Sequence, residues 1–286
     1  MILYFNVDDE LIKEINSTSK SKGKEPTSVF IEWVSTKKGT DQKKAGALLS
    51  QTDILEKYIK KLPIVIFDRD REITTSEYDW LKKFSNVTLF EPTVLHRDGF
   101  KYLPHWTRIK KLEDIKLNEN KRGINLGYIG DFTDKFESFK KYYLNTKSWM
   151  SDVESPIEVS YDTKISSESR DGVCEKYGVK KENLRFDNID FTVIIGSYKD
   201  YLTGFLDPYY FKALENNCIP VVPKENRFYS SLPYSISYDA WFSEYYNMYE
   251  KTYIGLIKNI YENIEKYYPE MDIKYAADTI KKYLGE

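Results

Sequence analysis

Residues 191–225 read FTVIIGSYKDYLTGFLDPYYFKALENNCIPVVPKE, and this stretch decides the fold. The run VIIG is apolar and β-branched, which is typical of a buried strand, and IPVV, after the turn NNC, is a second such run. Between them a polar loop leads into a helical pattern over 208–217. A buried strand, a helix and another buried strand predict a parallel sheet with helices on its faces.

The same alternation extends outward along the chain. The expected strands are 2–7, 28–35, 64–67, 87–90, 124–130, 191–196, 219–222 and 234–237. Helical patterns lie between them, and one begins with Thr74-x-x-Glu77, which predicts a capping box. Two terminal helices are expected over 240–264 and 272–284.

A polar, charge-rich segment at 108–122 separates two such patterns, so it is interpreted as a connection between domains, or else as a solvated helix of one domain. The predicted fold class is therefore α/β, with two Rossmann-like domains facing a central cleft, the arrangement called GT-B. The predicted domains are 1–118 on the acceptor side and 119–286 for nucleotide-sugar binding, the last helix being free to cross back to the first.

Composition excludes several classes of protein. The chain has 286 residues and a formal net charge of -2, which argues against a surface coated in positive charge. Cys174 and Cys218 are too few for a disulfide framework and have no metal-ligand spacing, so buried reduced thiols are expected. His96 and His105 lack companions at ligand spacing. No membrane span or basic leader is seen, so a soluble cytoplasmic protein is expected.

The 191–225 segment also resembles the donor-binding signature of GT-B glycosyltransferases. In those enzymes a Glu of this helix accepts hydrogen bonds from the nucleotide ribose, because one carboxylate can accept from both hydroxyls of a diol. The helix start suits a diphosphate. The candidate donor-binding residues here are Ser197, Tyr209, Tyr210, Lys212 and Glu215. The alternative is that Lys212 and Glu215 form a surface pair three residues apart.

A second candidate lies at GYIGDFTDKFESF, residues 127–139. A glycine at a strand end allows a phosphate or sugar to approach the backbone, and an Asp or Thr after it caps the next helix. Gly130 and Asp131 are therefore added to the donor-binding candidates. The alternative is an ordinary turn, since Gly-x-Gly-x-x-Gly is absent.

A third candidate, IVIFDRDREIT at 64–74, places charged side chains just beyond an apolar strand. Transfer with inversion needs a carboxylate base, whereas transfer with retention can use arginine to stabilise the leaving diphosphate. Asp68, Arg69 and Asp70 are the predicted catalytic residues, and a loop of surface ion pairs is the alternative.

Together these segments resemble the glucosyltransferases with which T-even-like bacteriophages decorate hydroxymethylated cytosine in their own DNA. Residues 67–106 also look like the small phage enzyme that adds a second glucose to glucosyl-hydroxymethylcytosine. The resemblance implies a GT-B fold, UDP-glucose as donor, and double-stranded modified DNA as acceptor. It places Glu215 at the ribose, Lys212 where the family has a diphosphate-binding arginine, and the 68–70 loop on the acceptor side.

Lysines in the predicted N-domain loops fit a DNA acceptor, since phosphate contacts position a protein on DNA. The DNA-binding candidates are Lys20, Lys22, Lys24, Lys37 and Lys38. Ordinary solvated lysines are the alternative.

The partner and cofactor expectations follow from the same resemblance. No resident cofactor and no metal site are expected, while Mg²⁺ is left open. The protein is expected to work as a monomer or weak dimer in the cytoplasm of a phage-infected bacterial cell. Two other functions stay open: a bacterial glycosyltransferase acting on cell-envelope saccharide, and a non-catalytic protein that binds a nucleotide sugar.

Overall fold

The computed structural model of the chain divides into two compact units. The residues that it describes are 1–17, 25–33, 51–115, 125–130, 135–141, 158–163, 168–177, 179–223, 227–229, 235–236 and 250–285. The first unit is Met1–Trp106 with Glu270–Glu286, and the second is Thr107–Pro269. The connection expected at 108–122 thus begins within the second unit, and the last helix belongs to the first.

The first unit is built on a five-stranded parallel sheet whose strands follow one another in chain order. The strands are β1 (Ile2–Phe5), β2 (Ser28–Glu32), β3 (Ile64–Phe67), β4 (Val87–Glu91) and β5 (Phe100–Tyr102). All four residues of β3 are buried, because helices cover both faces of the sheet and neither face meets water.

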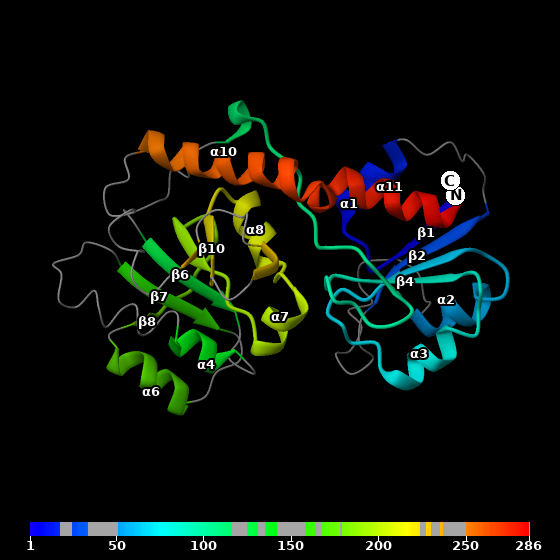
Figure 1. Cartoon of the computed structure of the whole chain (residues 1–286), viewed down its shortest axis with the longest axis horizontal. Helices are drawn as coiled ribbons and strands as arrows, with labels where there is room; N and C mark the ends of the chain where they lie inside the picture. The colour runs from blue at the N-terminus through cyan, green and yellow to red at the C-terminus, as the bar shows by residue number, and fades with distance from the viewer. Residues whose placement is uncertain are drawn as a thin grey trace. The chain divides into compact units, whose positions relative to one another are not determined.

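Helices α1 (Asp9–Ser17) and α11 (Ile273–Leu284) lie on one face of this sheet, and α2 (Gln51–Tyr58) and α3 (Thr75–Leu81) on the other (Figure 1). Each face has its own apolar core. The capping box is confirmed: Glu77 N donates to Thr74 Oγ1 at 3.3 Å, and Thr74 N donates to Glu77 Oε2 at 2.7 Å.

The second unit is also parallel, but its strand order differs. Its strands are β6 (Asn125–Gly130), β7 (Glu158–Thr163), β8 (Lys180–Lys181), β9 (Phe191–Val193), β10 (Ile219–Pro223) and β11 (Ser235–Ile236). They lie in the order β11-β10-β9-β6-β7-β8. The chain therefore winds outward from β6 in one direction and from β9 in the other, which is the doubly wound order of Rossmann sheets.

The helices that flank this sheet among the described residues of the second unit are α4 (Phe136–Phe139), α6 (Glu168–Lys176), α7 (Tyr198–Thr203), α8 (Tyr209–Glu215) and α10 (Glu250–Tyr267). Figure 1 shows α8 and α10 on one face and α4 and α6 on the other. Helix α10 is fixed by buried tyrosines: Tyr253 Oη lies 2.7 Å from two backbone carbonyl oxygens, and Tyr261 donates to Leu214 O at 3.1 Å.

The α/β class with parallel sheets is confirmed, and so are the two buried free cysteines, Cys174 and Cys218. Among the described helices none combines the length and the apolar character that crossing a membrane requires.

Candidate functional site

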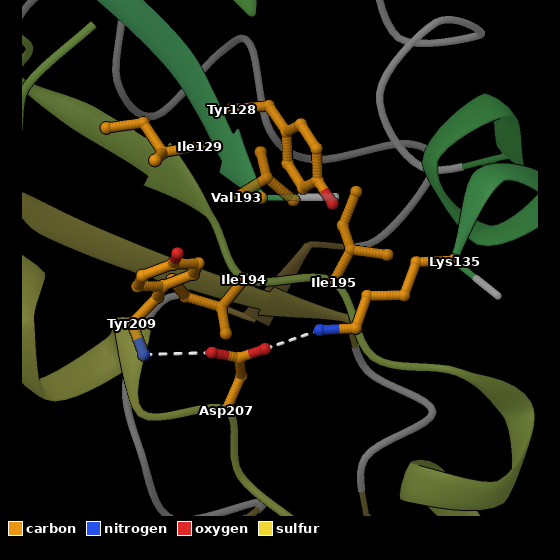
Figure 2. Close-up of a pocket in the computed structure, with 9 residues that line it drawn as sticks. Tyr128, Ile129, Lys135, Val193, Ile194, Ile195, Asp207 and Tyr209 are labelled. Carbon is orange, nitrogen blue, oxygen red and sulfur yellow. Dashed lines mark hydrogen bonds and ion pairs between the residues drawn. The ribbon is translucent and has the colours of Figure 1, made fainter. Parts of the chain in front are cut away.

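A pocket lies where the strand order of the second sheet reverses. Strands β6 and β9 are neighbours in the sheet but lead away from each other, so their carboxyl ends open a space between two connections. The residues around it are Tyr128, Ile129, Gly130, Lys135, Val193, Ile194, Ile195, Asp207 and Tyr209. Most of the lining is apolar, and Figure 2 shows one cation and one carboxylate at its side.

That pair is Lys135 and Asp207. Lys135 Nζ lies 2.5 Å from Asp207 Oδ2, and the two side chains are only 15% and 10% exposed. Asp207 Oδ1 accepts from Tyr209 N at 2.9 Å, so this carboxylate also caps the start of α8 (Figure 2). Together the two charges nearly cancel. Lys135 comes just before α4 and Asp207 comes shortly before α8, so these helices hold the two side chains at the pocket.

Two glycines of β6 explain why this strand fits here. A Cβ on Gly127 would lie 2.8 Å from Ile189 Cδ1 and 3.1 Å from Leu184 Cδ1, so only glycine lets the neighbouring side chains close over the strand. A Cβ on Gly130 would overlap the hydroxyl of Tyr128. Gly130 thus leaves room for the Tyr128 ring at the pocket.

The structure brings only part of the predicted donor site together. Gly130 and Tyr209 line the pocket. Tyr210 is fully buried, with its ring 5.4 Å from that of Phe211. Ser197 caps α7 through a capping box with Asp200. Asp131 lies outside the described residues.

Lys212 and Glu215 are exposed on α8 but differ in position. The ammonium of Lys212 lies 5.3 Å from the ring centroid of Tyr209, which lines the pocket. Glu215 is the last residue of α8 and leads into β10. At about 1.5 Å per residue it lies about 9 Å along the helix from Tyr209, toward the amino edge of the sheet.

In the first unit, the carboxyl edge holds three buried carboxylates at the ends of adjacent strands. Glu32 ends β2, Asp68 follows β3, and Glu91 ends β4, and each residue is at most 3% exposed. Asp68 Oδ1 accepts from Glu72 N at 2.7 Å, and Oδ2 accepts from Ile73 N at 3.0 Å.

One arginine neutralises two of these carboxylates. Arg97 donates to Asp68 Oδ2 at 2.5 Å and to Glu91 Oε2 at 2.6 Å, and its third contact is the carbonyl of Ile73 at 2.9 Å. Burial raises the pKa of Asp68, while the bond from Arg97 opposes that rise. As a base, Asp68 would first have to leave these hydrogen bonds.

The other two predicted catalytic residues lie beside Asp68. Asp70 is exposed, whereas Arg69 is half-buried, with Nη1 3.5 Å from Glu32 Oε2. Burial raises the pKa of Glu32 to about 7, although Arg69 and the backbone of Asp8 favour the ionised form. Atom Oε1 of Glu32 has no hydrogen-bond partner.

The five DNA-binding candidates, Lys20, Lys22, Lys24, Lys37 and Lys38, lie outside the described residues. Within the part of the chain that the structure describes, no three His, Cys, Asp or Glu side chains gather as metal ligands do.

Sequence reasoning missed Lys135 and Asp207 at the pocket, and Glu32 and Glu91 at the first sheet. Lys135 and Asp207 are 72 positions apart, so only the fold pairs them. Glu32 and Glu91 could have been found in the sequence, because each ends an apolar run, FIE and LFE, as Asp68 does in IFD. An acid at the end of a parallel strand points to the edge where sites form.

The chain was compared with known proteins. No protein-family model matches it, and no curated protein sequence matches it. Among solved structures it is similar to a mutant of S. aureus TarM in complex with fondaparinux, alpha-GlcNAc-glycerol and UDP, with TM-score 0.47 and 7% identity, covering 78% of this chain and 51% of that chain. The chain thus spans about half the length of TarM.

Two further similar structures are also of glycosyltransferases. One is WaaG, a glycosyltransferase involved in lipopolysaccharide biosynthesis, with TM-score 0.47 and 13% identity, covering 98% of each chain. The other is an alpha-glucosyltransferase in complex with UDP and a 13-mer DNA containing a central A:G mismatch, with TM-score 0.43 and 11% identity, covering 94% of this chain and 78% of that chain.

Proposed function

We propose that the protein is a GT-B glycosyltransferase whose second unit binds a UDP-sugar at the pocket between β6 and β9. The observation that carries this proposal is the buried Lys135–Asp207 pair at the point where the sheet order reverses. Doubly wound sheets bind nucleotides at such a point, outside the carboxyl ends of their strands.

The chemistry of the pair suits a diphosphate. Lys135 carries a mobile point charge on a long stem, and the ammonium can turn from the carboxylate to a phosphate oxygen without leaving the pocket. Asp207 keeps its bond from Tyr209 N in that state, so the start of α8 stays in place. Ile129, Ile194 and Tyr209 form the apolar part of the lining beside the pair.

The acceptor that we propose is phage DNA, with glucose transferred to hydroxymethylated or already glucosylated bases. The support is the resemblance of most of residues 64–225 to phage DNA glucosyltransferases. Lysines of the first unit would contact DNA phosphates, and a sugar already attached in the major groove would spare the enzyme the cost of flipping a base.

Calorimetric titration with UDP tests the donor site. Lys135→Ala is expected to weaken binding by about 1.5–3 kcal/mol, as for loss of a hydrogen bond to a charged group. Lys140→Ala is the matched control, because Lys140 follows α4 and is exposed. Equal affinity of the Lys135 variant and the wild type would remove the pocket from the proposal.

The same titration decides the ribose assignment. If Glu215 holds the ribose, Glu215→Ala weakens UDP binding as much as Lys135→Ala does. Its place at the far end of α8 instead favours unchanged affinity, with the ribose closer to Tyr209.

An acceptor panel tests the rest of the proposal. Purified protein is given UDP-glucose with hydroxymethylated DNA, glucosylated DNA or a glycan, with and without a chelator, and products are read by mass spectrometry. Glucose on DNA alone supports the proposal. Transfer only to the glycan would establish the cell-envelope alternative, and UDP-sugar binding without any transfer or donor hydrolysis would establish a binding protein.

A further inference from the structure

The three carboxylates at the carboxyl edge of the first sheet are not equivalent. Asp68 and Glu91 are both held by Arg97 and by further hydrogen bonds, from backbone N–H groups and from Thr93 Oγ1. Their lone pairs are therefore used within the protein. Glu32 has a different environment, because Oε1 is buried and has no hydrogen-bond partner.

Glu32 is also weakly tied to its counter-ion. Its side chain is 4% exposed, whereas that of Arg69 is 35% exposed, and the distance of 3.5 Å between Oε2 and the guanidinium is long for a hydrogen bond. Arg69 can turn toward solvent or toward a phosphate and leave the carboxylate where it is. A buried oxygen without a hydrogen-bond partner lowers the stability of the folded protein. Such an oxygen needs an explanation, and a catalytic role is one.

We infer that Glu32, rather than Asp68, is the catalytic base of the proposed glycosyltransferase, and that it acts on a hydroxyl-bearing acceptor at the carboxyl edge of the first sheet. This inference rests on the proposed function. Oε1 is the atom that accepts the proton, and the half-exposed Arg69 lies next to the other oxygen, Oε2. Asp68 becomes a positioning residue, which holds the backbone of Glu72 and Ile73 next to that edge.

The step is a direct displacement. The acceptor hydroxyl gives its proton to Oε1 of Glu32 while its oxygen forms a bond to the anomeric carbon of the sugar. The bond from that carbon to the diphosphate breaks, and UDP leaves with the bonding electron pair. The sugar therefore changes its anomeric configuration, from α in UDP-glucose to β in the product.

The raised pKa of Glu32, about 7, fits this role. A base works best when its pKa lies near the operating pH, since it is then largely ionised and still basic. The charged groups that act on it are Asp8, from the residues before α1, whose carboxylate adds to the rise in pKa, and Arg69, from the loop after β3, which opposes it together with the backbone N–H of Asp8. Desolvation outweighs the effects that favour the ionised form, as it does at other catalytic carboxylates kept from water.

The test compares Glu32→Gln with two controls, Glu91→Gln and Glu10→Gln. The amide keeps the shape of Glu32 and is uncharged, so the variant should fold. We expect turnover to fall at least 100-fold with the KM for UDP-glucose within threefold of wild type. Glu91→Gln, equally buried, should keep the pH dependence of wild type, and Glu10→Gln, exposed on α1, should keep full activity.

Two measurements distinguish a catalytic base from a residue that only supports the structure. Wild-type turnover should rise with pH through a pKa near 7, and that limb should be absent from the residual activity of Glu32→Gln. The product of the wild type should be the β-anomer by NMR. A retained α-anomer, or Glu32→Gln turnover within threefold of wild type, overturns Glu32 as the base while leaving the glycosyltransferase in place. A wild-type chain that binds UDP-glucose but never transfers glucose overturns the proposed function, and the base with it.

Discussion

The two units carry parallel sheets with different strand orders and different charged groups at their carboxyl edges. The first sheet runs from β1 to β5 in chain order and ends in three buried carboxylates. The second reverses between β6 and β9, and there it presents a lysine. The lysine of the second edge can turn to a diphosphate, whereas a hydroxyl proton needs an acceptor such as a carboxylate of the first edge. Similar sheets can thus be assigned different halves of one reaction from their edge residues.

Of the substitutions that test this comparison, replacement of Arg97 should cause the largest loss of stability. Arg97→Ala leaves Asp68 and Glu91 buried without their cation, and breaking such a buried pair costs about 3 to 5 kcal/mol. Urea denaturation of the variant measures the loss. Arg185→Ala in the second unit, where the side chain is 66% exposed, is the control and should stay within about 0.5 kcal/mol of wild type. A similar small loss for Arg97→Ala would mean that the acidic edge is neutralised in another way.

The pH dependence of stability should separate Glu32 from the other carboxylates. Its pKa is about 7 in the folded protein against 4.5 for an ordinary glutamate in water, so between these values the folded state holds a proton that the unfolded state has lost. Its contribution is fully present below pH 4.5 and is lost as pH rises through 7, by on the order of 3 kcal/mol in total. Denaturation of wild type and Glu32→Gln from pH 4.5 to 8 should show the wild type losing more stability. Parallel curves would contradict the raised pKa.

A pair of glycines tests packing in the second unit. Gly127→Ala should destabilise by about 1–3 kcal/mol, because the new Cβ meets Ile189 at 2.8 Å. Gly255→Ala on α10 meets nothing within 4 Å and should stabilise by about 0.5–1 kcal/mol through helix propensity. Thermal melts measure both. If both substitutions act alike, β6 is less tightly enclosed than these distances indicate.

The smallest expected effect is at Asp207. Asp207→Asn keeps a side-chain oxygen for Tyr209 N but removes the charge that competes with a diphosphate for Lys135. UDP affinity should rise by about threefold to tenfold, on the order of 1 kcal/mol. Lower affinity of this variant, measured under the same salt conditions, would indicate that the carboxylate itself binds the nucleotide.

Much of the fold could be predicted because it is encoded locally. The apolar runs at 64–67, 87–90 and 219–222 became strands, and the Thr74–Glu77 capping box begins α3 as expected. Strand order is a different matter. It depends on which strand each helix returns to, and the alternation of strands and helices is the same for the sequential and the doubly wound sheet.

Part of the candidate site could also be predicted, because that part too is encoded locally. Gly130 and Tyr209 were found because strand ends and helix starts can be identified in the sequence. Lys135 and Asp207 form one site through long-range pairing, and helix position separates Glu215 from Tyr209. The hydrogen bonding that distinguishes Glu32 from Asp68 is a tertiary property, which no local pattern reports.

The return of α11 to the first unit has a consequence for synthesis on the ribosome. Ile273, Ala276, Ile280 and Leu284 belong to the core over Phe30 and Val65, so that core lacks one of its walls until α11 has been made. The second unit is continuous in sequence from Thr107 to Pro269 and emerges complete before then. The second unit should therefore finish folding first, while the strands of the first unit, made before it, remain partly uncovered until α11 follows.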